Sequence, residues 1–112
     1  KRYNSLLRSK KIALPVTHDY AQPSWHLYII QLNDTQLNRE NIFTQMRDKG
    51  LGVNVHYRPI YLNPYYQSVG FEKGLCPNAE AYYASCISLP LYHGMSESEQ
   101  DTVIEVVNEV CV

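Results

Sequence analysis

One short stretch of the chain, residues 54–61, gathers most of the side chains that could bind an anion. It carries Asn54, His56, Tyr57, Arg58 and Tyr61. His56 and Arg58 supply hydrogen-bond donors for phosphate or carboxylate oxygens. A helix that begins after Asn63 would direct free backbone N–H groups toward the same ligand. The stretch therefore predicts an anion-binding site, and the alternative is a solvent-facing strand edge that carries ordinary polar residues.

Residue patterns typical of catalysis are missing from the sequence. The serines lie outside any Gly-x-Ser-x-Gly turn, there is no glycine-rich phosphate loop, and no lysine lies in an apolar segment that would lower its pKa. The four histidines, His18, His26, His56 and His93, lie too far apart for a local zinc motif. We therefore expect no catalytic residue and no metal site in this chain by itself.

The composition excludes several classes of protein. The chain has 112 residues, of which 45% are hydrophobic and 19% charged, as in an ordinary single globular domain. A formal net charge of −1 argues against a protein that binds the phosphate backbone of nucleic acids. No apolar stretch is long enough for a signal peptide or a membrane span, and the three cysteines form no Cys-x-x-Cys pair. We expect a reducing, cytoplasmic location.

Three apolar segments predict the strands that position residues 54–61. Residues 25–32 are almost continuously apolar and predict a buried central strand. Residues 52–57 alternate between apolar and polar side chains, which predicts a second strand with Tyr57 on its apolar face. Residues 87–89 predict a short third strand, whereas residues 12–24 read as a short extended piece followed by a loop.

Capping residues and helical spacing of apolar side chains predict five helices. Asn38 caps one helix that Gly50 ends, and Ser96 with Glu99 forms a capping box at the start of the last helix. The helices cover residues 1–7, residues 39–49, a short helix from Pro64 that stops at Gly70, a helix that starts at Pro77, and the last helix after Ser96. Three strands with helices on one face predict a two-layer α+β domain.

Five segments, in order along the chain, resemble the small domain of the sugar aminotransferases of the DegT/DnrJ/EryC1/StrS family, which are fold-type I enzymes dependent on pyridoxal phosphate. The segments are residues 1–7, 24–28, 46–61, 77–80 and 87–91. The sequence His-Tyr-Arg-Pro-Ile-Tyr at 56–61 most resembles transaminases that place an amino group on C4 of a UDP-linked 4-keto-6-deoxy-N-acetyl sugar, as in pseudaminic-acid or spore-coat polysaccharide synthesis. Tyr61 and His93 depart from residues common in the family, His and Pro respectively.

The resemblance implies that residues 1–112 are the C-terminal small domain of a longer enzyme. Pyridoxal phosphate would then be held by a preceding large domain that this chain does not contain. No lysine here matches the family's Schiff-base lysine, so no cofactor-binding residue is expected in this chain. The resemblance further implies that His56, Tyr57 and Arg58, with Asn54 and Tyr61 beside them, face the nucleotide-sugar side of the cleft.

The resemblance also implies a reaction for the full-length protein, which would be a cytoplasmic homodimer. It would move an amino group from an amino acid, glutamate, to a UDP-linked keto sugar, while the isolated fragment would be inactive. His26 matches a family strand residue, and we interpret it as structural. One alternative is a free-standing sugar-nucleotide-binding or dimerisation module without catalysis. A second, a tyrosine-rich binder of single-stranded nucleic acid, needs a basic groove that the charge pattern does not supply.

Overall fold

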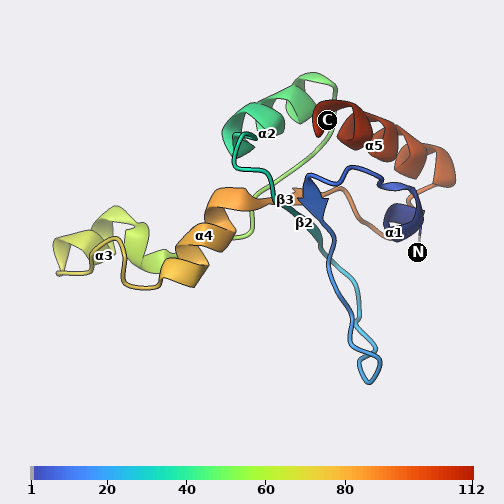
Figure 1. Ribbon diagram of the computed structural model, residues 1–112. Helices are drawn as coiled ribbons and strands as arrows, with labels where there is room; N and C mark the ends of the chain where they lie inside the picture. The colour runs from blue at the N-terminus through green and yellow to red at the C-terminus, as the bar shows by residue number, and fades with distance from the viewer. Residues whose placement is uncertain (1) are drawn as a thin grey trace.

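A three-stranded antiparallel sheet forms the centre of the molecule in the computed structural model, which describes residues 2–112 (Figure 1). The strands are β1 (Ile12–Ala13), β2 (Tyr28–Leu32) and β3 (Cys86–Leu89), and β2 pairs with both neighbours. β2 is therefore the central strand, as the sequence predicts, although it begins at Tyr28 rather than at residue 25.

Helices cover one face of this sheet because alternate residues of β2 point to it. Tyr28, Ile30 and Leu32 are buried on that face, and Ile30 has no exposed surface. The covering helices are α1 (Arg2–Leu6), α2 (Arg39–Asp48) and α5 (Glu97–Val110), with α2 and α5 side by side above the sheet in Figure 1. The predicted α+β class is confirmed, and we call the sheet with these three helices the body.

Local signals fix both ends of α2 and the start of α5. The side chain of Asn38 accepts a hydrogen bond from the N–H of Asn41, and Gly50 ends α2 with a φ of 85°. The predicted capping box of α5 is present, since Ser96 and Glu99 each accept from the other's backbone N–H. These boundaries agree with the sequence prediction to within one or two residues.

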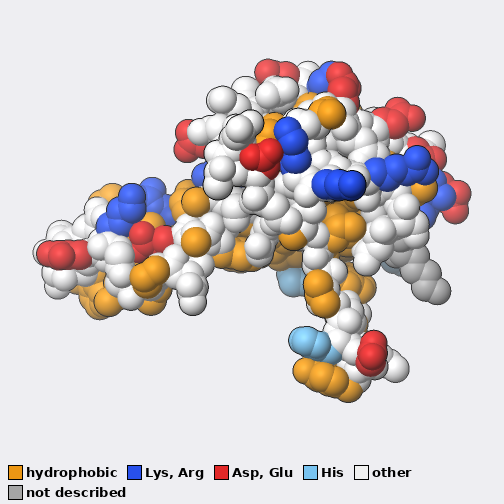
Figure 2. Space-filling view, in the orientation of Figure 1, with side chains coloured by type: hydrophobic (Ala, Val, Ile, Leu, Met, Phe, Trp, Pro, Cys, Tyr) orange, Lys and Arg blue, Asp and Glu red, His pale blue; other side chains and the backbone are white. Residues whose placement is uncertain are grey.

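Two parts extend away from the body. One is the loop of residues 14–27 between β1 and β2, and the other is the arm, residues 60–85, formed by the 3-10 helix η1 (Ile60–Leu62), α3 (Pro64–Ser68) and α4 (Pro77–Ser85) (Figure 1). Because of them the radius of gyration is 15.5 Å, above the roughly 13 Å expected for a compact chain of this length. Figure 2 shows hydrophobic side chains exposed along the arm and at the tip of the loop.

The prediction of a strand over residues 52–57 is wrong. This segment makes a single bridge, between Asn54 and Ser88 of β3, and the third strand of the sheet is β1 instead. Beyond the C-terminal end of β3, the next hydrogen-bonded pair would need an N–H from Pro90, and proline has none. In the other direction the N–H of Cys86 is already bonded to the carbonyl of Tyr82 at the end of α4. The ladder therefore stops after one pair.

Other predictions are corrected in detail. Tyr57 was expected on an apolar face but is 73% exposed, because no sheet continues past Asn54 to impose the alternation. The helix predicted from Pro64 is present as α3 and ends at Ser68, and the side chain of Asn63 before it makes no capping hydrogen bond. The predicted first helix is present as α1, and its first residue, Lys1, lies outside the described residues.

Candidate functional site

A pocket of ≈ 520 Å³ opens beside the bridge between residue 54 and β3. Its walls come from the end of α2, the segment 50–56, the end of β3 with the loop that follows it, and the first turns of α5. The polar groups that line it are the side chains of His26, Asn54, His56, Ser88, Tyr92, Glu99 and Thr102. Apolar side chains such as Leu89, Met95 and Val103 line the remainder, which gives a surface suited to one polar organic ligand.

Asn54 and His56 reach this pocket because the backbone of residue 54 is paired with β3. The N–H of Asn54 donates to the carbonyl of Ser88 at 3.1 Å, and the N–H of Ser88 donates to the carbonyl of Asn54 at 2.8 Å. Two residues on, Nδ1 of His56 lies 2.7 Å from Oγ of Ser88. The half-buried imidazole is therefore attached to the sheet, and both predicted residues lie on one wall.

Another part of the lining, the start of α5, holds an ionised carboxylate. The hydroxyl and N–H of Ser96 both donate to Oε2 of Glu99, at 2.7 Å each, and the hydroxyl of Tyr92 donates to Oε1 at 2.9 Å. These hydrogen bonds, led by that of the Ser96 hydroxyl, lower the pKa of Glu99, and the carboxylate in turn raises the pKa of Tyr92. The pocket thus has an acceptor on this wall.

Tyr57 and Arg58 lie outside the pocket, on the exposed segment that leads to the arm. One guanidinium nitrogen of Arg58 donates to the carbonyl of Leu62 at 2.6 Å, which turns the side chain toward η1. A guanidinium has five N–H donors, so Arg58 keeps donors for a ligand that extends beyond the pocket. The structure therefore places the five predicted residues in two groups, with only Asn54 and His56 at the pocket.

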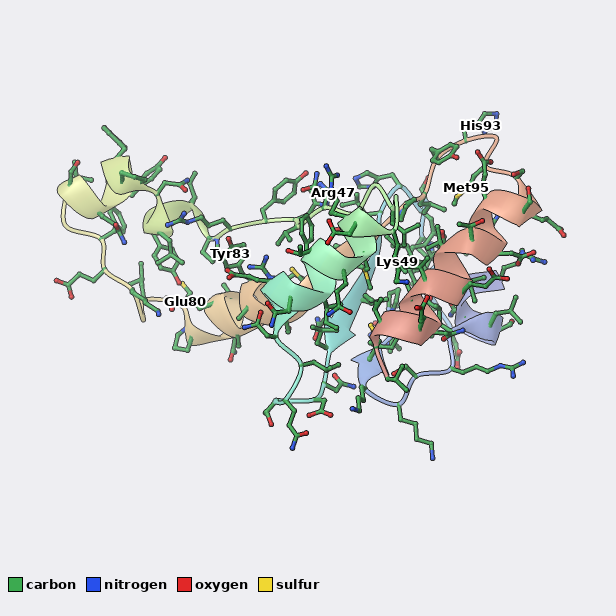
Figure 3. The ribbon with its side chains drawn as sticks, turned by 90° about the horizontal axis from the view of Figure 1, so that it is seen from above. Arg47, Lys49, Glu80, Tyr83, His93 and Met95 are labelled. Carbon is green, nitrogen blue, oxygen red and sulfur yellow. The ribbon has the colours of Figure 1, made fainter. Side chains whose placement is uncertain are left out.

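Tyr61 joins the parts of the arm to one another. Its side chain is buried, and its hydroxyl donates to Oε1 of Glu80 at 2.7 Å and accepts from the N–H of Cys76 at 3.1 Å. The N–H of Gly74 donates to the same carboxylate oxygen at 2.6 Å. Burial, and next the bond to Glu80, raise the pKa of Tyr61, while the hydroxyl of Tyr61 lowers the pKa of Glu80. Figure 3 shows Glu80 on the arm, distant from His93 and Met95 in the loop before α5.

Several residues of the pocket were missed by the sequence reasoning. His26 was interpreted as structural, but it is exposed and lines the pocket. Apart from the capping box, nothing in the sequence marked Tyr92 or Glu99 as site residues. Ser88 could have been found, since a single hydroxyl within an apolar strand must find a hydrogen-bond partner when the strand is buried.

The described residues contain neither a cluster of metal ligands nor a membrane-spanning helix. Across residues 2–112 no three His, Cys, Asp or Glu side chains are grouped so that they could hold a metal ion. No helix within the same residues has both the length and the apolar character needed to cross a membrane.

Comparison with known sequences gives one family. The DegT/DnrJ/EryC1/StrS aminotransferase family matches residues 1–108. The spore coat polysaccharide biosynthesis protein SpsC of Bacillus subtilis is 37% identical over 100 residues, which are 86% of this chain and 26% of SpsC. The chain thus spans about a quarter of the length of the curated relatives it matches.

Comparison with solved structures gives the same family. Spr1654 of Streptococcus pneumoniae, named as a sugar aminotransferase and solved in its PLP form, superposes with a TM-score of 0.88 at 30% identity, over 98% of this chain and 29% of that one. PseC of Helicobacter pylori, an aminotransferase of pseudaminic-acid biosynthesis, superposes with a TM-score of 0.69 at 26% identity. The match covers 76% of this chain and 23% of PseC. The resemblance in the sequence is confirmed, and the chain belongs to the DegT/DnrJ/EryC1/StrS family of pyridoxal-phosphate-dependent sugar aminotransferases.

Proposed function

We propose that this chain is the C-terminal domain of a longer aminotransferase that transfers an amino group from glutamate to a UDP-linked 4-keto-6-deoxy sugar. The family match over residues 1–108 supports this, together with relatives of which the matched part is only about a quarter. SpsC and PseC, by their names, belong to spore-coat polysaccharide and pseudaminic-acid biosynthesis. The proposal includes a homodimeric, cytoplasmic enzyme.

The four lysines among the described residues 2–112 do not fit the cofactor. A lysine that reacts with the aldehyde of pyridoxal phosphate needs an amine that can lose its proton in a sheltered site. Lys49 is ion-paired, with Nζ 2.8 Å from Oε1 of Glu109 (Figure 3), and Nζ of Lys11 lies 3.5 Å from Oδ2 of Asp34. Lys10 and Lys73 are exposed. In this proposal the cofactor is therefore held by the large domain.

The chain's own contribution is to bind the nucleotide sugar, and the observation that carries this is the pocket wall formed by Asn54 and His56. An amide and an imidazole, with the carboxylate of Glu99 in the same lining, offer both donors and acceptors, which suits the hydroxyl and carbonyl groups of a sugar or a base. Arg58, outside the pocket, would contact the diphosphate. Tyr57, exposed beside Arg58, offers a flat ring to the same ligand.

The test is kinetic and uses the full-length enzyme with its sugar nucleotide. Arg58→Ala should raise KM more than it lowers kcat, because a contact to the diphosphate is present in both the ground state and the transition state. The matched control is Arg47→Ala, since Arg47 is an exposed arginine in the last turn of α2 that does not itself line the pocket (Figure 3). A fall in kcat at unchanged KM would instead place Arg58 near the reacting carbon.

Two further observations separate this proposal from a binding module without catalysis. The coding frame upstream of residue 1 should encode a large α/β domain with a lysine for the cofactor. The 112-residue chain mixed with pyridoxal phosphate should not develop the visible absorbance of a lysine adduct. Formation of such an adduct at one specific lysine of this chain would contradict the assignment of the cofactor to the large domain.

A further inference from the structure

Ser88 is the buried polar residue of the sheet. It lies in the middle of β3, is 3% exposed, and pairs with Ile29 of β2 on one side and with Asn54 on the other. Its backbone N–H and carbonyl are both bonded to Asn54. The position of its hydroxyl is therefore fixed by hydrogen bonds and by two neighbouring segments of chain.

Within residues 2–112 the Ser88 hydroxyl has one hydrogen-bond partner, Nδ1 of His56 at 2.7 Å. A hydroxyl always carries one proton to donate, whereas a neutral imidazole carries its proton on either Nδ1 or Nε2. A buried donor without an acceptor is costly, more so than an acceptor with a free lone pair. The arrangement that leaves no buried donor unpaired has the Ser88 proton directed at Nδ1.

The other ring nitrogen then takes the proton. If Nδ1 of His56 accepts from Ser88, the neutral ring must carry its hydrogen on Nε2. Nε2 has no hydrogen-bond partner within residues 2–112, and His56 lines the pocket. An uncharged His56 thus keeps one free N–H donor, on a residue that lines the pocket.

We propose that Ser88 is a positioning residue, which holds His56 in the Nε2–H tautomer so that this N–H is presented to an acceptor oxygen of the ligand. The ligand group is a carbonyl, hydroxyl or phosphate oxygen. That this oxygen belongs to a sugar nucleotide rests on the proposed function, whereas the tautomer does not.

The tautomer is measured by NMR on the 112-residue chain with ¹⁵N-labelled histidine. At about pH 9, well above the ordinary imidazole pKa of ~6.5, the two ring nitrogens of His56 should give separate shifts of the Nε2–H form. His56→Gln assigns the signals, and exposed His93 provides the shifts of a ring free to exchange tautomers. Ser88→Ala should move the His56 shifts toward those of His93.

Matched variants separate positioning from general damage to the fold. Ser85→Ala removes another hydroxyl, bonded to the carbonyl of Ala81 in α4, and should leave the His56 shifts unchanged. Ser88→Thr keeps the hydroxyl and should restore the Nε2–H signature. A wild-type His56 that is mainly Nδ1–H would overturn the proposal, as would unchanged shifts in a folded Ser88→Ala protein. If Ser88→Ala does not fold, the wild-type spectrum decides alone.

A binding measurement on the full-length enzyme tests the consequence for the ligand. Titration with UDP should give a lower affinity for Ser88→Ala than for Ser85→Ala and wild type. If UDP does not bind to wild type while the tautomer is as proposed, the sugar-nucleotide function fails and the role of Ser88 stands. If UDP binds equally to all three proteins and the His56 shifts do not change, the role of Ser88 fails and the function stands.

Discussion

The body and the arm of this molecule are stabilised in different ways. The body buries a continuous apolar cluster, in which Ile30, Met46, Ile87 and Val107 have no exposed surface. In the arm, α3 and α4 have no buried residues, and its parts are joined by the hydroxyl of Tyr61 and the carboxylate of Glu80. Hydrophobic burial thus stabilises the body, whereas the arm depends on a few hydrogen bonds around the buried ring of Tyr61 and on ring contacts of Tyr66 with Tyr65 and Phe71.

Because of this difference, we expect the arm to change shape more readily than the body. A cluster of buried side chains opens as a unit, whereas a segment with few buried contacts opens locally at low cost. The pocket with His56 lies on the body, while Tyr57 and Arg58 lie between body and arm. We therefore expect a ligand to find a rigid wall at His56 and a more adaptable contact at Arg58.

The largest expected difference between the two regions is in thiol reactivity. Cys76 in the arm is exposed, whereas Cys86 and Cys111 are buried in the body and burial raises the pKa of Cys111 to about 11. Ellman's reagent should label one thiol per chain quickly and the other two only when the body opens, slower by orders of magnitude. Cys76→Ser should abolish the fast phase. Two fast thiols in the wild-type chain would show that the body is not the stable unit.

A second prediction compares one isoleucine from each region. Ile30→Ala should lower the free energy of unfolding by about 2–5 kcal/mol, because it leaves a cavity at the centre of the sheet. Ile60→Ala in the arm, at a side chain that is 61% exposed, should change it by less than about 0.5 kcal/mol. Urea denaturation of both variants measures the two values. Equal losses would mean that the arm contributes to the same core.

The capping box of α5 gives a smaller effect that depends on pH. Ser96→Ala should lower the free energy of unfolding by about 1 kcal/mol, while Ser68→Ala on exposed α3 should lower it much less. Because Ser96 lowers the pKa of Glu99 from its ordinary 4.5, this stabilisation is complete above pH 4.5 and is lost as the pH falls through the lower folded value. Thermal melts at pH 7 and pH 3 should therefore show a smaller difference between wild type and Ser96→Ala at pH 3. A constant difference would exclude the carboxylate from the effect.

The smallest global effect is expected for Tyr61→Phe, which should act within the arm. Loss of the hydroxyl frees Glu80 and the N–H of Cys76, so amide exchange at Gly74 and Cys76 should become several-fold faster. The melting temperature of the body should stay close to that of wild type, as it should for Tyr65→Phe, a control at an exposed ring. A large drop in melting temperature would show that the arm and body unfold together.

The sequence could predict only those residues of the candidate site that lie together in one segment of the chain. Asn54 and His56 were identified from residue type and spacing, and both lie at the pocket. The same reasoning grouped them with Tyr61, whose hydroxyl turned out to be bonded within the arm. Spacing along a chain does not show where the chain turns, so residues seven positions apart can serve different regions.

Helices whose capping hydrogen bonds and apolar stripes are local could be predicted from the sequence. Asn38, Gly50 and the pair Ser96–Glu99 set the ends of α2 and α5 because caps act over three or four residues. Whether residues 52–57 form a strand could not be predicted from the sequence, because a strand needs a partner that only the tertiary structure supplies. Pro90 and the α4 end at Cys86 limit that pairing to Asn54 with Ser88. The contact of His56 with Ser88 joins residues 32 positions apart, and no local pattern encodes it.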